Sequence, residues 1–273
     1  IGVCPAGLTT MLQPAAIAQI GGNEYVAVAS GYDRAERTLT LTFDDGPDRE
    51  TTQMLLDELS AAGVPAAFFL QGKFVAEHPD LVDRMVREGH TVGGHSVNHP
   101  NMAEVPRWRQ QYETVTTDLL IRAAAGTSTA IWRQPYDDGV NRDGFQNVTA
   151  ILLAQQLGYT HIGYDFDTLD WDIVARPGAT AADIRLPDFE SGRPMTVLMH
   201  DAGGPRRELT VEYVAEHLIP AAREAGYTFI SLQGASSELA EANTPVTADW
   251  RDHMTMFATK ALYHWPSAIL EWV

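Results

Sequence analysis

Two adjacent carboxylates, Asp44 and Asp45, follow an apolar run and precede a Gly-Pro breaker at residues 46–47. Each would be costly at the end of a buried strand unless it were paired with a cation or bound to a metal. Further along, His95 and His99 are spaced to bring both imidazoles to one side of a helical turn. Two imidazoles and one carboxylate form a metal site with positions open for water and substrate. The residues therefore favour a catalytic metal site, with a surface histidine pair in a turn as the alternative.

Other polar and aromatic residues also follow segments that have the pattern of strands. These are Arg133 and Tyr136 after residues 130–132, Asp167, Asp170 and Trp171 after residues 159–164, and His200 at the end of residues 195–200. α/β folds place their active sites where strands end. We therefore expect these side chains to meet at one edge of a sheet.

Strand and helix patterns alternate along the chain from about residue 38 to residue 232. Strands are expected at 38–43, 65–70, 90–94, 130–132, 159–164, 195–200 and 227–232, and helices at 50–62, 78–89, 107–125, 148–158 and 210–226. Regular alternation of this kind predicts an α/β protein with a parallel sheet covered by helices. The pattern alone leaves open whether the sheet is open or closed into a barrel.

Composition excludes several classes of protein. The chain has 273 residues, 45% of them hydrophobic, and a formal net charge of −17. Such an acidic chain is not expected to bind nucleic acid, because phosphate neutralisation needs Lys and Arg. Cys4 is the single cysteine, which excludes an intrachain disulfide and a cysteine-rich zinc site.

The order of these motifs resembles the NodB-homology polysaccharide deacetylases, carbohydrate esterase family four. Five motifs carry the resemblance: TFDDGP at 42–47, HSVNH at 95–99, RQPY at 133–136, DTLDW at 167–171 and LMH at 198–200. Gln134 departs from the family pattern, in which Pro or Ala is usual. The resemblance spans about residues 38–232 and implies a deformed (β/α) barrel with about seven parallel strands.

The resemblance implies different roles for the two adjacent aspartates. By analogy Asp45 binds a divalent metal ion with His95 and His99, and Asp44 is the general base, paired with Arg133. Zinc is the favoured ion, although cobalt, nickel or manganese fits the same ligand set. Such an ion offsets adjacent negative charges and activates water.

The resemblance also assigns the remaining residues. It makes His200 the general acid, with Asp170 as the carboxylate that holds its imidazole protonated, and it places an oxyanion-binding backbone N–H at Tyr136. Trp171 and Leu198 would line a pocket for the acetyl methyl group. The polar segment 137–147 is expected to form part of the substrate groove.

We expect three segments along the chain. An N-terminal extension covers residues 1–35, the deacetylase domain covers 36–236, and a C-terminal extension covers 237–273. Trp265 and Trp272 flank a short apolar segment, as interfacial aromatics do beside a membrane span. One interpretation is a tether or a fusion to a membrane glycosyltransferase outside this chain. The alternative is a C-terminal helix that packs on the domain.

Together, the residues and the resemblance predict a metal-dependent N-deacetylase. The expected partner is an acetylated glycan with N-acetylglucosamine units, such as peptidoglycan, a chitin-like polymer or poly-N-acetylglucosamine. An extracellular or periplasmic location follows from such a substrate. Two alternatives are an amidohydrolase of the same fold that acts on a small amide, and an inactive glycan-binding module.

Overall fold

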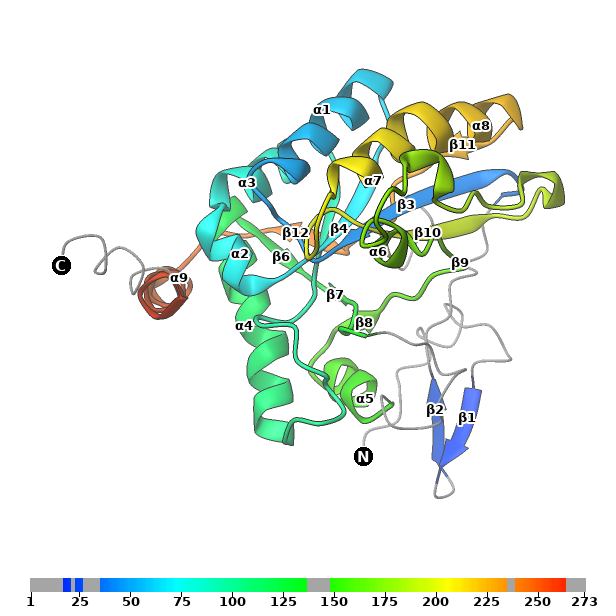
Figure 1. Cartoon of the computed structure of the whole chain (residues 1–273). Coiled ribbons are helices and arrows are strands. Elements are labelled where there is room, and N and C mark those ends of the chain that lie inside the picture. The colour runs from blue at the N-terminus through cyan, green and yellow to red at the C-terminus, as the bar shows by residue number, and fades with distance from the viewer. Residues whose placement is uncertain (1–16, 21–22, 27–34, 137–147, 235–238, 264–273) are drawn as a thin grey trace, which may run out of the picture.

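A curled parallel sheet forms the centre of the molecule (Figure 1). The computed structural model describes residues 17–20, 23–26, 35–136, 148–234 and 239–263. The strands run in the spatial order β8-β7-β5-β4-β3-β10-β9, and β11 also pairs with β3. Their bounds are β3 Thr38–Asp44, β4 Ala66–Leu70, β5 Thr91–Gly94, β7 Ile131–Trp132, β8 Thr160–His161, β9 Phe166–Asp167, β10 Met195–His200 and β11 Thr228–Phe229.

Every pairing in this sheet is parallel. β8 and β9 end the path, and no ladder joins them among the described strands, so the barrel is incomplete at that point. The predicted deformed (β/α) barrel with about seven parallel strands is therefore confirmed. Because all strands point the same way, their carboxyl ends meet at one edge, as expected.

The alternating sequence of β3 places apolar side chains on one face of the sheet and polar side chains on the other. Leu39, Leu41 and Phe43 belong to the main apolar core between the sheet and the helices. Successive side chains of a strand point to opposite faces, so Thr42 and Asp44 face the barrel interior. The next strand, β4, alternates in the same way. Phe68 packs in the main core, whereas its neighbour Phe69 packs in a second apolar cluster with Ile131 and Ile162.

Helices pack against the outside of the sheet (Figure 1). Those of the barrel are α1 Thr51–Ala62, α2 Gly72–Glu77, α3 Pro79–Arg87, α4 Arg107–Ala125, α5 Val148–Gln156, α6 Asp170–Ile173, α7 Glu208–Glu212 and α8 Ile219–Glu224, with a π-helical turn at Tyr213–Leu218 and 3-10 turns at Ala181–Asp183 and Phe189–Ser191. α1 and α4 each end at a glycine with left-handed backbone, Gly63 and Gly126. These glycines sit where the sequence predicted the ends of both helices.

Some elements differ from the sequence-based expectations. The short helix α2 was not expected, because six residues after a strand carry too little periodicity to mark a helix. The helix expected at 210–226 starts at Glu208 and contains the π-helical turn. The strands expected at 159–164 and 227–232 are reduced to two residues each.

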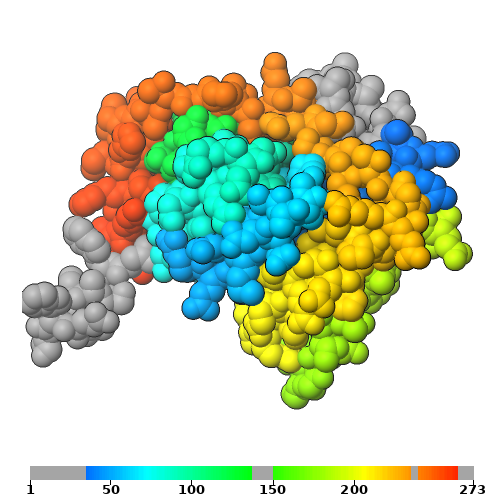
Figure 2. All heavy atoms as spheres, turned by 90° about the horizontal axis from the view of Figure 1, so that it is seen from above, coloured from blue at the N-terminus to red at the C-terminus, as the bar shows by residue number. Residues whose placement is uncertain are grey.

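The segment after residue 238 packs on the barrel. Strand β12, Asn243–Pro245, pairs antiparallel with β6, Thr127–Thr129. Helix α9, Trp250–Tyr263, packs against α4 and α2. Figure 2 shows this segment, coloured orange to red, against the green and cyan parts of the chain. Near the N-terminus, β1 (Ile17–Ile20) and β2 (Asn23–Val26) form an antiparallel hairpin.

No helix in the described part of the chain has the length and apolar character needed to cross a bilayer. Trp265 and Trp272, on which the predicted membrane span depends, lie outside the described residues.

Candidate active site

The carboxyl edge of the sheet gathers the polar residues singled out in the sequence. Asp44 ends β3 and His200 ends β10, and the two residues are paired in the ladder between these strands. His95 follows β5, and Arg133 follows β7, which pairs with β5 through Gly94 and Trp132. Asp170 follows β9 as the first residue of α6. Parallel pairing thus brings together residues that are up to 156 positions apart in the sequence, from Asp44 to His200.

Asp45, His95 and His99 form a cluster whose ligand atoms all lie within 4.8 Å of one another. The Nε2 atoms of His99 and His95 lie 3.2 Å and 3.5 Å from the same Oδ1 atom of Asp45. Gln71 also donates a hydrogen bond from Nε2 to this oxygen, at 2.8 Å. The donor types and their convergence fit a divalent metal ion.

The two histidines lie in an irregular loop after β5, so the expected helical turn is wrong. Their rings converge because the backbone adopts left-handed conformations at Ser96 (φ 67°) and His99 (φ 57°). Left-handed residues other than glycine cost of order 1–3 kcal/mol each, so the surroundings must stabilise this loop. The Nδ1–H of His95 donates to the carbonyl oxygen of Arg133 at 2.9 Å, which leaves Nε2 as a metal ligand atom.

Asp44 forms a buried ion pair with Arg133. Oδ1 of Asp44 accepts a hydrogen bond from Nη1 of Arg133 at 2.7 Å, and both side chains are shielded from solvent. The guanidinium also donates to Oγ1 of Thr42 and to the carbonyl oxygens of Ile162 and Gly163. These hydrogen bonds fix the orientation of the Arg133 guanidinium. The guanidinium in turn fixes the Asp44 carboxylate next to the candidate metal cluster.

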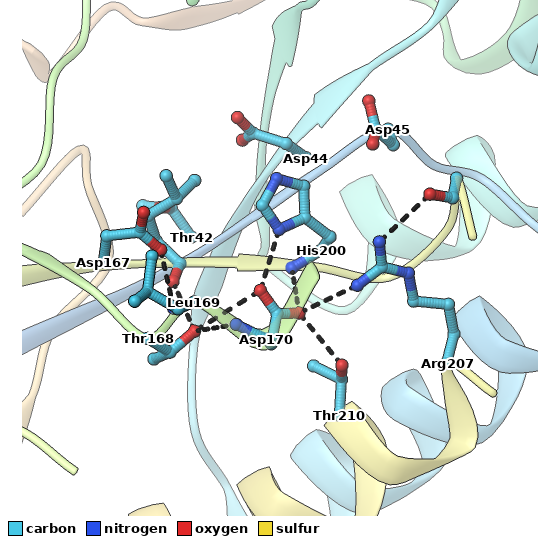
Figure 3. A network of polar contacts seen from close by, with 12 residues as sticks. Thr42, Asp44, Asp45, Asp167, Thr168, Leu169, Asp170, His200, Arg207 and Thr210 are labelled. Carbon is cyan, nitrogen blue, oxygen red and sulfur yellow. Dashed lines mark hydrogen bonds and ion pairs between the residues drawn. The ribbon is translucent and has the colours of Figure 1, made fainter. Parts of the chain in front are cut away.

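The imidazole of His200 lies between the carboxylates of Asp44 and Asp170 (Figure 3). Its Nδ1 donates to Oδ1 of Asp170 at 2.8 Å. The other oxygen of Asp170 accepts from the backbone N–H of His200, from Nη1 of Arg207 and from Oγ1 of Thr210. Asp170 is fully buried, and these donors stabilise its charge.

These contacts change the pKa of several groups. Burial works against the imidazolium form of His200, but the charge and hydrogen bond of Asp170 outweigh it and raise the pKa of His200 to about 9. Burial lowers the pKa of His95, against the opposing effect of nearby carboxylates. For Asp45, burial is outweighed by the hydrogen bond with His99 and by nearby histidines, which hold its pKa below the usual range. The cluster therefore favours a carboxylate and a neutral His95, the forms in which they bind metals.

Two exposed aromatic side chains stand beside these buried groups. Tyr136 is 56% exposed and Trp171 is 49% exposed, whereas Leu198 is buried on β10. The ring of Tyr136 packs edge-on against His99 with centroids 4.6 Å apart. Among the described residues, no acceptor is recorded for the backbone N–H of Tyr136. The segment 137–147, expected to form part of the groove, lies outside the described residues.

Four residues that contact the site were not identified from the sequence. Gln71 contacts Asp45, while Arg207 and Thr210 contact Asp170. Gly203 packs against the Asp45 carboxylate so closely that a Cβ atom on it would lie 2.5 Å from Oδ2. The paired glycines after His200 were the one available signal, because adjacent glycines often mark a close approach of backbone to another group.

Comparisons with known proteins agree with this arrangement. Residues 31–162 match the family model described as polysaccharide deacetylase. The chain is 29% identical over 211 residues to a peptidoglycan-N-acetylglucosamine deacetylase of Bacillus cereus, covering 77% of this chain and 71% of that protein. It is 32% identical over 203 residues to a chitooligosaccharide deacetylase of Bradyrhizobium, covering 70% of this chain and 87% of that protein.

A solved structure has the same fold. The crystal structure of the Bc1960 peptidoglycan N-acetylglucosamine deacetylase superposes with a TM-score of 0.64 at 27% identity, covering 74% of this chain and 89% of that chain. The chain therefore belongs to the polysaccharide deacetylase family and is a hydrolase of carbon–nitrogen bonds other than peptide bonds.

Proposed function

We propose that this protein is a metal-dependent N-deacetylase that hydrolyses the acetamide of N-acetylglucosamine units in an extracellular glycan. The observation that carries this proposal is the position of two buried acid–base pairs beside one candidate metal cluster. In the first pair, Arg133 fixes the position of the Asp44 carboxylate. In the second, Asp170 keeps the imidazole of His200 protonated. Amide hydrolysis needs one group to accept a proton and another to donate one.

Asp45, His95 and His99 would hold the metal ion. Their donor set of one carboxylate and two imidazoles suits Zn²⁺, and also Co²⁺, Ni²⁺ or Mn²⁺. Zn²⁺ is proposed because it commonly takes such ligands in hydrolases. When bound, such an ion polarises the acetamide carbonyl and lowers the pKa of water.

The chain's own residues would move the protons. As the water oxygen bonds to the carbonyl carbon, Asp44 accepts the proton that this water loses. As the carbon–nitrogen bond breaks, His200 gives its proton to the departing amine, and acetate and a glucosamine unit result. The backbone N–H of Tyr136 would donate to the oxygen of the tetrahedral intermediate.

A glycan substrate is supported by the exposed aromatics and by the relatives. The half-exposed ring of Tyr136 packs against His99, so an aromatic surface lies open to a sugar ring next to the candidate metal cluster. The relatives are named for peptidoglycan and for chitooligosaccharides. We therefore propose an extracellular or periplasmic enzyme, with residues 36–236 as its deacetylase domain and the flanking segments as extensions.

The test is acetate release from a panel of substrates by the purified chain. Chitooligosaccharides, peptidoglycan fragments and small acetamides would each be incubated with metal-free protein and with Zn²⁺-loaded protein, and mass spectrometry would detect the loss of an acetyl group. The proposal expects deacetylation of the glycans that requires Zn²⁺. Activity on small acetamides alone would support an amidohydrolase with another substrate. Glycan binding without acetate release would support an inactive binding module.

A further inference from the structure

Glu113 is a fully buried carboxylate that lies behind the loop of the two candidate histidine ligands. It belongs to α4, and its exposed fraction is 0%. Its Oε2 atom accepts hydrogen bonds from the backbone N–H groups of Val97 and Asn98, at 2.8 Å and 2.9 Å. Its Oε1 atom accepts from Nδ2 of Asn98 at 3.4 Å and from Nε of Arg109 at 3.3 Å. A buried carboxylate on a neighbouring helix thus binds the backbone between the two ligands.

The position of these bonds within the loop matters. Val97 and Asn98 lie between the left-handed residues Ser96 and His99. This conformation exposes two successive N–H groups toward α4, where they need an acceptor, because an unpaired buried N–H is costly. Glu113 supplies that acceptor, and its bonds oppose relaxation of the left-handed residues that aim the histidine rings.

Helix α9 adds a second contact to the same loop. The hydroxyl of Tyr263 accepts a hydrogen bond from Nδ2 of Asn98 at 2.8 Å. α9 packs along α4, and Arg122 of α4 forms an ion pair with Asp252 of α9 at 3.4 Å. The last residue of α9 therefore reaches the ligand loop, although α9 lies outside the residues that match the family model.

We propose that Glu113 is a positioning residue for the metal site and that Tyr263 of α9 assists it through Asn98. This inference rests on the proposed function, because it takes His95 and His99 as metal ligands. Residues that hold metal ligands in position through hydrogen bonds influence metal affinity, and their mutation typically lowers metal affinity or activity by about 10–100-fold. Helix α9 of the C-terminal extension would then support the metal site through Tyr263.

The experiment measures the affinity of the full chain for Zn²⁺ by competition with a chromophoric chelator. Glu113→Gln keeps the size of the side chain but replaces one acceptor oxygen with an amide that faces the donors of Asn98 and Arg109. We expect the Kd for Zn²⁺ to rise about tenfold or more. Tyr263→Phe removes one hydrogen bond and should raise the Kd by about threefold.

Asp118→Asn is the matched control. Asp118 is also a buried carboxylate on α4 that accepts a backbone N–H, but the donor is Thr129 of β6, away from the ligand loop. Its loss should destabilise the fold and leave the Kd for Zn²⁺ within about twofold of the original. Thermal unfolding without metal measures the stability of each variant separately.

The inference is overturned if Glu113→Gln leaves the Kd for Zn²⁺ unchanged, or if Asp118→Asn raises it equally. If Glu113→Gln does not fold, Tyr263→Phe and Asn98→Ala decide the matter, since both leave the buried carboxylate in place. An unchanged Kd in both would also overturn it. The original chain and His99→Ala are measured in the same experiment. Zn²⁺ binding that is unchanged in His99→Ala would refute the proposed metal site itself.

Discussion

Replacing Asp170 by Asn tests the pairing that would keep His200 protonated. The asparagine side chain is similar in size, and its carbonyl oxygen still accepts a hydrogen bond from Nδ1 of His200. The negative charge is lost, however, and this charge with its hydrogen bond raises the pKa of His200 to about 9. Burial, which favours the neutral imidazole, then lowers the pKa of His200 without the opposing effect of Asp170.

The size of the effect follows from the two pKa values. Without the charge of Asp170 we expect the pKa of His200 to fall to its ordinary value of 6.5 or below, a drop of about two units or more. At a pH of about 7.5 nearly all His200 is then protonated in the original chain and at most about a tenth in the variant. If His200 is the general acid, kcat should drop at least about tenfold at this pH from ionisation alone.

The pairing also contributes to stability. Because the folded pKa of His200 is raised above its unfolded value, its contribution is complete below pH 6.5 and is lost as the pH rises through about 9. The shift corresponds to roughly 3 kcal/mol. The free energy of unfolding of the original chain should fall over this pH window, and Asp170→Asn should remove the contribution.

The assay is an NMR titration of the histidine side chains in the metal-free chain, followed by the pH dependence of acetate release. Asp172→Asn serves as control, because Asp172 lies on the same short helix but pairs with Arg176 at the surface. An unchanged pKa of His200 in Asp170→Asn would refute the electrostatic argument. A lowered pKa with an unchanged pH dependence of the rate would refute the role of His200 as the acid.

Three further variants test the rest of the site. Asp44→Asn should reduce acetate release by at least about a hundredfold, since it removes the proposed base, and Zn²⁺ content should stay the same. His99→Ala should lower both the bound Zn²⁺, measured by atomic emission, and the rate. Gly203→Ala should weaken Zn²⁺ binding because its Cβ would press on Asp45, whereas Gly178→Ala, at a similar φ (78°) with open space, should only lower the melting temperature.

Each of these has an outcome that contradicts it. A fully active Asp44→Asn would mean that another group accepts the proton. Unchanged Zn²⁺ content in His99→Ala would place the metal elsewhere. Equal Zn²⁺ affinity in Gly203→Ala and Gly178→Ala would show that the close approach to the carboxylate has no effect on the ligand.

The position of the site could be predicted because most of the functional residues end or closely follow a strand that the sequence marks. The Thr-Leu alternation before Asp44 marks β3, and the apolar run before His200 marks β10, so that parallel pairing places both residues at one edge. The family resemblance then assigned roles to them. The local pattern that marks a strand and its end is encoded over short distances, whereas the pairing of β3 with β10 joins distant parts of the chain.

The contacts behind the site could not be predicted in the same way. Glu113 lies in the middle of a helix whose sequence mixes polar and apolar residues on all sides, and nothing in its neighbours marks it as buried. Gln71 acts through an amide at the start of a helix that was not expected. Such contacts depend on the orientation of helices against loops, which tertiary packing determines.

The two adjacent aspartates show how one dipeptide serves two sites. Asp44 is the last residue of β3, and strand alternation directs its side chain into the barrel toward Arg133. Asp45 has a left-handed backbone, with φ of 78°, which turns the chain out of the strand and directs the next carboxylate to Gln71 and His99. Because their partners differ, one carboxylate is held by a guanidinium while its neighbour remains available to a metal ion. Their separation depends on a single backbone conformation, which is why two like charges can stand side by side at the end of a buried strand.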